Sequence, residues 1–342
     1  MNHKNLSVKI KIPRLLINKL NNKKINKIYK EFEKTFPIKE SFIVSVSGGP
    51  DSLALAFLAK IYSLKNKIKS KFFIIDHKLR SESTREAKVV KQVLKKYLIN
   101  AKILTWRGKK PSKNIQAIAR KKRYDLLFAK CKELKINNVL LGHHQDDLFE
   151  NFFLRMLRGS GLKGLVSLDK KSVNNHKNLL RPLLYQKKED LVFIANNIFN
   201  FYVQDPTNKD VKYKRTKVRK LIEELEKNGL DKKKFLKTIN NLQNSNNVVN
   251  FYVNENLRKN SFFNKKKANL ILNKQFFQQP HEVIFRALSE SIKLVGKRYY
   301  SARGKKLDKI IRDIENNTLF KLTLGGCIIK KVNQTVIISK EH

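Results

Sequence analysis

The residues best suited to chemistry form a short string directly after a β-forming run: Ser47-Gly48-Gly49-Pro50-Asp51-Ser52. Glycine lets the backbone approach an anion closely, and the free N–H groups at the start of a following helix point at it. Ser47 and Ser52 add hydroxyl donors, while Asp51 can hold a magnesium ion that bridges phosphate oxygens. No Gly-Lys-Ser/Thr closes the string, so it is not the commoner phosphate loop. A plain β–α turn explains a bare Gly-Gly, whereas the full string favours a pyrophosphate site.

A second polar string carries two imidazoles and three carboxylates, and its members are Gly142, His143, His144, Asp146, Asp147 and Glu150. Asp147 and Glu150 are three residues apart, which places them on one face of a helix. One interpretation is a hydrolase-like metal site made by His143, His144 and Asp147, although adjacent histidines are hard to aim at one ion. The other is an acid–base site whose carboxylates hold an ammonium group and help to remove its proton. Asp146 is expected to cap the helix in either case.

The segments that position these strings alternate between strand and helix. Such alternation predicts an α/β fold, a parallel sheet with helices on both faces, whose ligands bind beyond the C-terminal ends of the strands. The polar strings at 47–52, 76–80 and 143–147 all follow strands, so we expect them to converge on one crevice. The expected strands are the run before Ser47 and residues 71–75, 101–104 and 138–141; the expected helices are 53–62, 115–131, 148–157 and one capped by Ser83 with Glu86 as its capping-box partner.

The charge of the chain points to a polyanionic partner. Its 342 residues contain 75 Lys+Arg and 28 Asp+Glu, a net charge of +47. An excess of this size favours nucleic acid, and no long apolar run supports a membrane. Part of the excess is expected from the Lys- and Asn-rich composition of an AT-rich genome. Cys131 and Cys327 are too far apart for a C-x-x-C site and suggest inert thiols in a reducing cytoplasm.

The C-terminal third differs in character from the rest. Residues 228–313 are expected to be helical, with Phe pairs at 262–263 and 276–277 that are more often core than base-stacking platforms. Short β-rich runs follow at 319–323, 327–332 and 335–339. We therefore predict two domains, residues 1–227 with the polar strings and residues 228–342 as a basic, mostly helical region ending in strands.

The string at 47–52 resembles the pyrophosphate-loop (PP-loop) signature of the ATP pyrophosphatases, which split ATP between its α- and β-phosphates. Further strings occur in the order found in the tRNA(Ile)-lysidine synthetases, and the chain resembles this family over roughly residues 44–219. These strings are Asp76-His77-x-Leu79-Arg80, Arg120-x-x-Arg123-Tyr124, Gly142-His143-His144-x-Asp146-Asp147-x-x-Glu150, Arg181-Pro182-Leu183-Leu184 and Asp205-Pro206-Thr207-Asn208. Two positions depart from the family: Thr207 replaces Ser, and Arg215-Thr216 stands where the family carries Arg-Asn.

The resemblance implies a PP-loop fold, similar to that of the adenine-nucleotide α-hydrolases. It implies an ATP- and Mg²⁺-dependent ligase that joins free L-lysine to C2 of the wobble cytidine in a minor isoleucine tRNA with a CAU anticodon. Cytosine O2 would first attack the α-phosphate, and the lysine amine would then displace AMP. The product, lysidine, pairs with A instead of G and changes the amino-acid specificity from Met to Ile.

When the functional residues of the family are transferred to the matching positions of this sequence, the resemblance assigns catalysis to Asp51, Asp147, Glu150 and Arg215. It also implies that Asp51 holds Mg²⁺. The residues it assigns to ATP are Ser47, Gly48, Gly49, Pro50, Asp51, Ser52, Asp76, His77, Arg80, Arg120, Gly142 and His143. The basic segment after residue 220 and the β-rich end would bind tRNA in the cytoplasm, with no membrane involved. The oligomeric state is open, and a homodimer is one of the states considered.

Three other functions share parts of this pattern. A PP-loop tRNA thiolase would normally need catalytic or cluster-binding cysteines, which two distant cysteines supply poorly. An amide-forming synthetase does not explain the charge of +47. A non-catalytic RNA-binding protein on the same fold would not need Asp51, Asp147 and Glu150.

Overall fold

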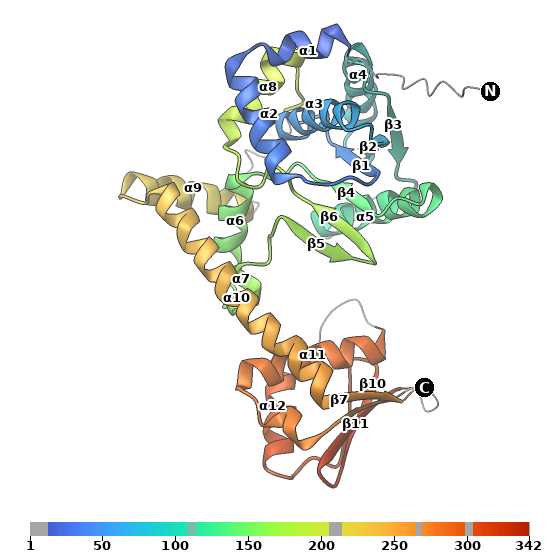
Figure 1. The fold of residues 1–342 in the computed structure, drawn as a ribbon, viewed down its shortest axis with the longest axis vertical. Coiled ribbons are helices and arrows are strands. Elements are labelled where there is room, and N and C mark those ends of the chain that lie inside the picture. Colours follow the sequence, from blue (N-terminus) through green and yellow to red (C-terminus); the bar gives the residue numbers. More distant parts are fainter. Residues whose placement is uncertain are drawn as a thin grey trace, which may run out of the picture. The chain divides into compact units, whose positions relative to one another are not determined.

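The computed structural model describes residues 13–108, 111, 114–204, 214–264, 269–297 and 304–341. The chain divides into two compact units, Met1–Lys232 and Lys233–His342 (Figure 1). Within the described ranges, every helix is too short or too polar to span a membrane. The expected turn at residues 205–208 lies outside the described residues.

The first unit is built on a six-stranded sheet with the order β3-β2-β1-β4-β6-β5. Neighbouring strands are parallel except for β5, which runs antiparallel to β6. The parallel sheet and its four expected strands are confirmed. The strands are β1 Phe42–Val46, β2 Ser70–Asp76, β3 Ala101–Thr105, β4 Asn138–Leu140, β5 Lys171–Asn174 and β6 Lys177–Leu180.

Helices cover both faces of this sheet, as the alternating pattern predicts (Figure 1). Val44 and Val46 of β1 pack on the cluster formed with α1, α2, α3, α4 and α8. Ile43 points to the other face and packs with Tyr124 and Leu127 of α5. The helices are α1 Arg14–Leu20, α2 Lys23–Thr35, α3 Pro50–Lys65, α4 Ser83–Lys96, α5 Ile115–Leu134, α6 Gln145–Met156, α7 Leu162–Leu165, α8 Lys188–Phe199 and α9 Lys214–Lys227.

Helix α3 is buried on nearly all sides and starts at the first polar string. Leu53, Leu55, Phe57 and Leu58 are fully inaccessible, because α3 lies against the sheet and is covered by α2 and α8. A helix held this firmly gives a fixed position to the residues at its N-terminus.

The second unit pairs helices with a five-stranded antiparallel sheet of order β7-β8-β11-β10-β9. The three C-terminal strands are confirmed, but the helical expectation for 228–313 is wrong at β7 and β8. The elements are α10 Lys232–Asn260, β7 Ser261–Asn264, β8 Asn269–Leu272, the 3₁₀ helix η2 Lys274–Phe277, α11 His281–Gly296, α12 Gly304–Glu315, β9 Lys321–Leu324, β10 Cys327–Val332 and β11 Thr335–Lys340.

The two Phe pairs behave differently from each other. Phe276 is fully buried, as expected of a core residue. Phe262 and Phe263 lie on the edge strand β7 and are 66% and 44% exposed, so the core prediction is wrong for this pair. Both side chains remain accessible because β7 pairs with β8 alone.

Candidate active site

The glycine loop, residues 47–52, joins β1 to the N-terminus of α3. Ser52 Oγ accepts the backbone N–H groups of Ser47 and Gly48, both at 3.1 Å, and donates to the carbonyl of Gly49 at 3.0 Å. Gly48 has a φ of +89°, and a Cβ there would lie 2.7 Å from Val90 Cγ2, so glycine is required. The loop thus has a fixed shape, and the first N–H groups of α3 have no acceptor within the helix.

His144 connects the glycine loop to the second polar string. Its Nε2 lies 3.6 Å from Oδ2 of Asp51 and 3.6 Å from Oδ2 of Asp147. Its Nδ1 accepts the N–H of Asp146 at 3.2 Å, so the neutral ring carries its proton on Nε2, facing both carboxylates. The strings that follow β1 and β4 therefore meet at the C-terminal edge of the sheet.

The N-terminal cap of α6 differs from the predicted one. His144 is the capping residue, and Asp147 completes a reciprocal capping box by accepting the backbone N–H of His144 at 3.1 Å. Asp146 contributes only its backbone N–H to the cap, and its carboxylate lies 4.0 Å from Lys232 Nζ. The prediction that Asp146 caps this helix is wrong, because the imidazole before it reaches the free N–H.

Gly142 allows the two strings to approach. A Cβ at this position would lie 3.2 Å from the carbonyl carbon of Asp51 and 3.2 Å from Cα and N of Ser52. These are backbone atoms, which cannot swing aside as a side chain can. Because Gly142 has no side chain, the residues after β4 can lie in contact with the start of α3.

The two acids facing His144 have opposite pKa shifts. Burial raises the pKa of Asp51, partly offset by the imidazole of His144. Burial also acts to raise the pKa of Asp147, but His144, the hydrogen bond from its backbone N–H and the nearby Arg215 oppose it, and this pKa lies below its usual range. Asp147 is therefore a stable anion at neutral pH.

A cavity of about 480 Å³ opens beside Asp147. It brings together four residues that the sequence assigned to the site: Arg120, His143, Asp147 and Arg215. Sequence reasoning missed other members of its lining, which are Asn151, Arg155, Arg158 and Lys214. Asn151, Arg155 and Arg158 follow Asp147 at the spacing of one helix face, a signal that could have identified them.

Glu150 lies one turn beyond Asp147 but is engaged by another part of the fold. It is 3% exposed, and Arg219 Nε on α9 lies 2.5 Å from its Oε1. Burial raises the pKa of Glu150, while Arg219 opposes the shift. Arg215, one turn before Arg219 on α9, lines the cavity, so this ion pair anchors the helix that delivers Arg215.

Asp76 at the end of β2 is tied to the segment that follows it. Its carboxylate accepts the N–H of Lys78 at 3.0 Å, the hydroxyl of Ser83 at 2.9 Å and the hydroxyl of Thr84 at 2.7 Å. The capping box predicted for Ser83 and Glu86 is therefore wrong. Ser83 turns to the buried carboxylate, and Glu86 pairs instead with Arg80 at 2.8 Å.

Histidines on the α5 side of the site are held neutral. Burial lowers the pKa of His143 to about 3, and the nearby guanidinium of Arg181 adds to this effect. Burial and Arg123 lower the pKa of His77 to about 4. Within the described chain, Nε of Arg123, Nε of Arg181 and Nδ1 of His143 are buried without a hydrogen-bond partner. Of these residues, His143 also lines the cavity beside Asp147.

Asp51 is the residue best placed to hold a divalent cation. Its Oδ1 is buried and has no hydrogen-bond partner among the described residues. The same residues contain no group of three or more His, Cys, Asp or Glu that could hold a metal, which leaves the hydrolase-like metal site unsupported. One carboxylate combined with phosphate oxygens is an ordinary way to bind Mg²⁺, so the residues fit that ion.

Comparison with known proteins identifies the family. Residues 18–225 match the family model of the PP-loop domain. The tRNA(Ile)-lysidine synthase of Orientia tsutsugamushi is 37% identical over 310 residues, covering 87% of this chain and 69% of that protein. The chain belongs to the tRNA(Ile)-lysidine synthase family. A second lysidine synthase, from Wolbachia pipientis, is 33% identical over 87% of this chain and 70% of its own length.

The fold extends beyond lysidine synthases. The structure of the U34-tRNA thiolase NcsA from Methanococcus maripaludis matches with a TM-score of 0.55 at 16% identity, covering 65% of this chain and 78% of that one. At this identity the likeness concerns the fold alone. Both cysteines here are buried, in different units, and burial raises the pKa of Cys131 to about 11.

Proposed function

We propose that this lysidine synthase family member joins free L-lysine to C2 of the wobble cytidine of a minor isoleucine tRNA, through an adenylated cytidine. The observation that carries the proposal is the meeting of Asp51 and Asp147 at one atom of His144, beside an arginine-lined cavity. The glycine loop on one side suits a triphosphate, and the cavity on the other suits a base and an amine.

In the first step, cytosine O2 attacks the α-phosphate of ATP and pyrophosphate leaves. The N-terminus of α3 and the glycine loop would hold the leaving pyrophosphate through backbone N–H groups. Mg²⁺ held by Asp51 and phosphate oxygens would neutralise the charge that develops on them. Arg120 and Arg215 line the cavity where the base would enter. Their guanidinium groups can contact the phosphates of the bound nucleotides with forked hydrogen bonds.

In the second step, the lysine amine attacks C2, the C2–O2 bond breaks and AMP leaves. Asp147 would bind the ammonium group, because it is an anion at neutral pH and faces the cavity. The amine, with a solution pKa of about 10.4, must lose one proton before attack and a second as the C–N bond forms. The second proton is the more acidic, since the nitrogen then bears positive charge beside an electron-poor carbon, and Asp147 can accept it. Glu150 would support this step by fixing α9 through Arg219.

The polyanionic substrate accounts for the charge of the chain. We propose that residues 1–227 form the catalytic domain and that residues 228–342 bind the tRNA, with the reaction in the cytoplasm. Many Lys side chains would supply salt-dependent affinity for the RNA backbone. The exposed pair Phe262 and Phe263 offers aromatic faces to unpaired bases.

The decisive experiment is incubation of the protein with ATP, labelled lysine and total tRNA, followed by nucleoside analysis. Label in one modified cytidine of one isoleucine tRNA supports the proposal. Absence of label, with tRNA still bound, would reject it in favour of an RNA-binding protein. Sulfur incorporation in the presence of a sulfur donor would favour a thiolase.

A further inference from the structure

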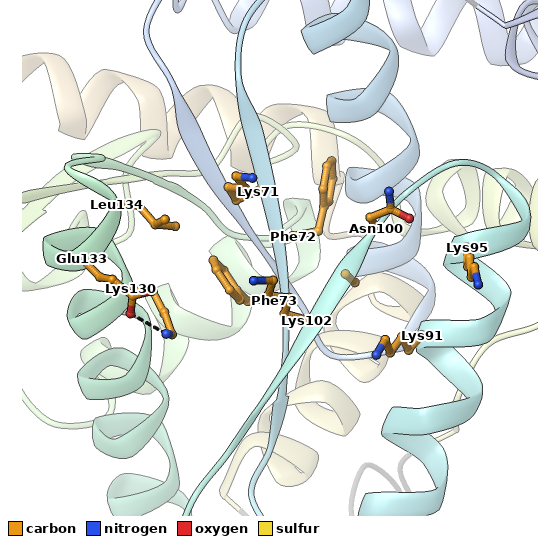
Figure 2. Close-up of a pocket in the computed structure, with 11 residues that line it drawn as sticks. Lys71, Phe72, Phe73, Lys91, Lys95, Asn100, Lys102, Lys130, Glu133 and Leu134 are labelled. Carbon is orange, nitrogen blue, oxygen red and sulfur yellow. Dashed lines mark hydrogen bonds and ion pairs between the residues drawn. The ribbon is translucent and has the colours of Figure 1, made fainter.

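A second cavity lies at the opposite edge of the catalytic sheet. Its volume is about 390 Å³, and it surrounds the first residues of β2 and β3 (Figure 2). The β2 residues at the cavity, Lys71 to Phe73, precede Asp76 at the active-site edge by five to three residues, which at ~3.3 Å each is about 10–17 Å along the strand. We call it the lysine pocket, after four of its lining residues: Lys71, Lys91, Lys95 and Lys102.

The four lysines reach the pocket from both faces of the sheet. Lys91 and Lys95 lie one turn apart on α4, as Figure 2 shows on one side of β3. Lys102 is opposite Phe73 in the parallel pairing of β2 and β3, and Lys71 shares the face of Phe73. Because β3 is the edge strand of the sheet, no further strand separates the two groups.

None of these four ammonium groups has a carboxylate partner among the described residues. The acid at the pocket, Glu133, is already paired with Lys130 at 2.5 Å on the other side of β3 (Figure 2). Like charges one helical turn apart, such as Lys91 and Lys95, destabilise a helix. Four cations that line one cavity without carboxylate partners in the described part of the chain give it a positive potential, which attracts an anion.

The form of the pocket favours an extended anion over a compact one. The pocket is lined by Phe72 and Phe73 on opposite faces of β2, which are 4% and 2% exposed and offer no side-chain hydrogen-bond donor to a deeply bound phosphate. The neighbouring parts of α4 and α5 are the C-terminal halves, which present no free backbone N–H groups to a compact phosphate. The donors are long lysine side chains with exposed ends, suited to phosphates that pass along the surface.

We propose that the lysine pocket binds backbone phosphates of the RNA substrate, away from the nucleotide that is modified. The inference rests on the proposed function in that RNA is the substrate. With the target base at the C-terminal edge of the sheet, the pocket engages the same RNA at the opposite edge. It contributes affinity that depends on salt and is independent of sequence.

The test compares two sets of four Lys→Gln substitutions. The pocket set is K71Q, K91Q, K95Q and K102Q, and the control set is K23Q, K27Q, K30Q and K34Q. The control lysines are exposed along α2, remove the same charge and do not gather around a cavity. A third protein, with all four pocket lysines changed to Arg, keeps the charge. Fluorescence of Trp106, the single tryptophan, verifies that the catalytic unit is folded.

Filter binding of unmodified tRNA is measured between about 50 and 300 mM salt. The pocket set should reduce the slope of log Kobs against log salt by about 2–3, because each phosphate contact contributes about 0.9. It should weaken binding about 10–100-fold at physiological salt, while kcat at saturating tRNA is unchanged. The Arg set should bind like the wild type.

Equal slopes for the pocket and control sets would overturn the proposal. So would unchanged RNA binding combined with lost binding of inorganic tripolyphosphate, since the pocket would then serve a small anion. Failure of the proposed function gives a different pattern: the wild type would make no lysidine, yet the pocket set would still lose RNA affinity. That result would uphold the pocket as an RNA contact while rejecting the reaction.

Discussion

Arg219 of α9 donates a hydrogen bond from Nε to Oε1 of Glu150 on α6, at 2.5 Å, and Glu150 is almost fully buried. The two residues are 69 positions apart in sequence. Their contact joins the helix that carries Asp147 to the helix that carries Arg215. Glu150, which the sequence analysis assigned to catalysis, is thus already paired with a guanidinium group of the same chain. Asp147 is therefore the acid that faces the cavity.

Replacing Arg219 should destabilise the catalytic unit. Arg219→Gln leaves the buried carboxylate of Glu150 without its charge partner, and we expect a loss of about 1–3 kcal/mol, less than for a fully buried pair because Arg219 is partly exposed. The double variant Arg219→Gln/Glu150→Gln should recover most of this loss. Urea unfolding followed by Trp106 fluorescence measures both. Strictly additive effects of the two substitutions would show that the pair is not coupled.

Substitution of Asp51 should abolish the first step. Asp51→Asn keeps the shape of the side chain but removes the charge that would hold Mg²⁺, so ATP–pyrophosphate exchange in the presence of tRNA should fall at least about 100-fold. Asp125→Asn, at an exposed position of α5, is the matched control. Exchange at the full rate in Asp51→Asn would remove the metal role from this residue.

Substitution of Asp147 should affect lysine more than ATP. Asp147→Asn can still accept the N–H of His144 and keep the α6 cap, but it cannot pair with an ammonium group. We expect the KM for lysine to rise about 10–100-fold, the range for losing a hydrogen bond to a charged group. Pyrophosphate exchange, which requires no lysine, should remain. A similar rise in the KM values for ATP and lysine would contradict the assignment of Asp147 to the amine.

The sequence predicted the catalytic fold well where side-chain burial dictates the pattern. The β1, β2 and β4 strands are short apolar runs, and polar strings that follow the strands of a parallel sheet share its C-terminal edge. The β5–β6 hairpin was missed because its strands are only four residues long and half of their residues are Lys and Asn. Strand β7 was missed because Phe262 and Phe263 are adjacent, which breaks the alternation expected of a half-buried strand.

The site was predictable as a set of residues but not as a set of contacts. Asp51 and Asp147 could be placed at one edge because each follows a strand of the predicted parallel sheet. That His144 would lie between them depends on its side-chain conformation and on the absence of a Cβ at Gly142. The pairing of Glu150 with Arg219 depends on α9 packing against α6, which no local pattern encodes.

A methyl group at Gly142 should disturb the ATP side of the site. In Gly142→Ala the new Cβ meets backbone atoms of Asp51 and Ser52 at 3.2 Å, so β4 and the start of α3 must separate by a few tenths of an ångström. We expect a several-fold rise in the KM for ATP and a loss of about 1–3 kcal/mol in stability. Gly161→Ala, where a Cβ would meet nothing within 4 Å, is the control. Equal KM values for the two variants would show that this contact does not shape the ATP site.

The stability of the catalytic unit should fall on mild acidification because of two histidines. Burial lowers the pKa of His77 to about 4 and that of His143 to about 3, whereas an unfolded histidine titrates near ~6.5. Below ~6.5 the unfolded chain binds protons that the folded chain does not, so each histidine costs about 1.4 kcal/mol per pH unit until its folded pKa is reached. Between about pH 7 and pH 5 this amounts to roughly 2 kcal/mol for His143, the more deeply enclosed of the two, and to less for His77, whose ring is partly exposed and screened by water.

The double variant His77→Asn/His143→Asn removes both groups and should therefore lose less stability than the wild type over this interval. Urea midpoints from Trp106 fluorescence at the two pH values measure the difference. His176→Asn, at an exposed turn between β5 and β6, should follow the wild type. If the double variant shows the same acid sensitivity as the wild type, these two side chains are protonated in the folded state, and the buried, neutral environment inferred for them is wrong.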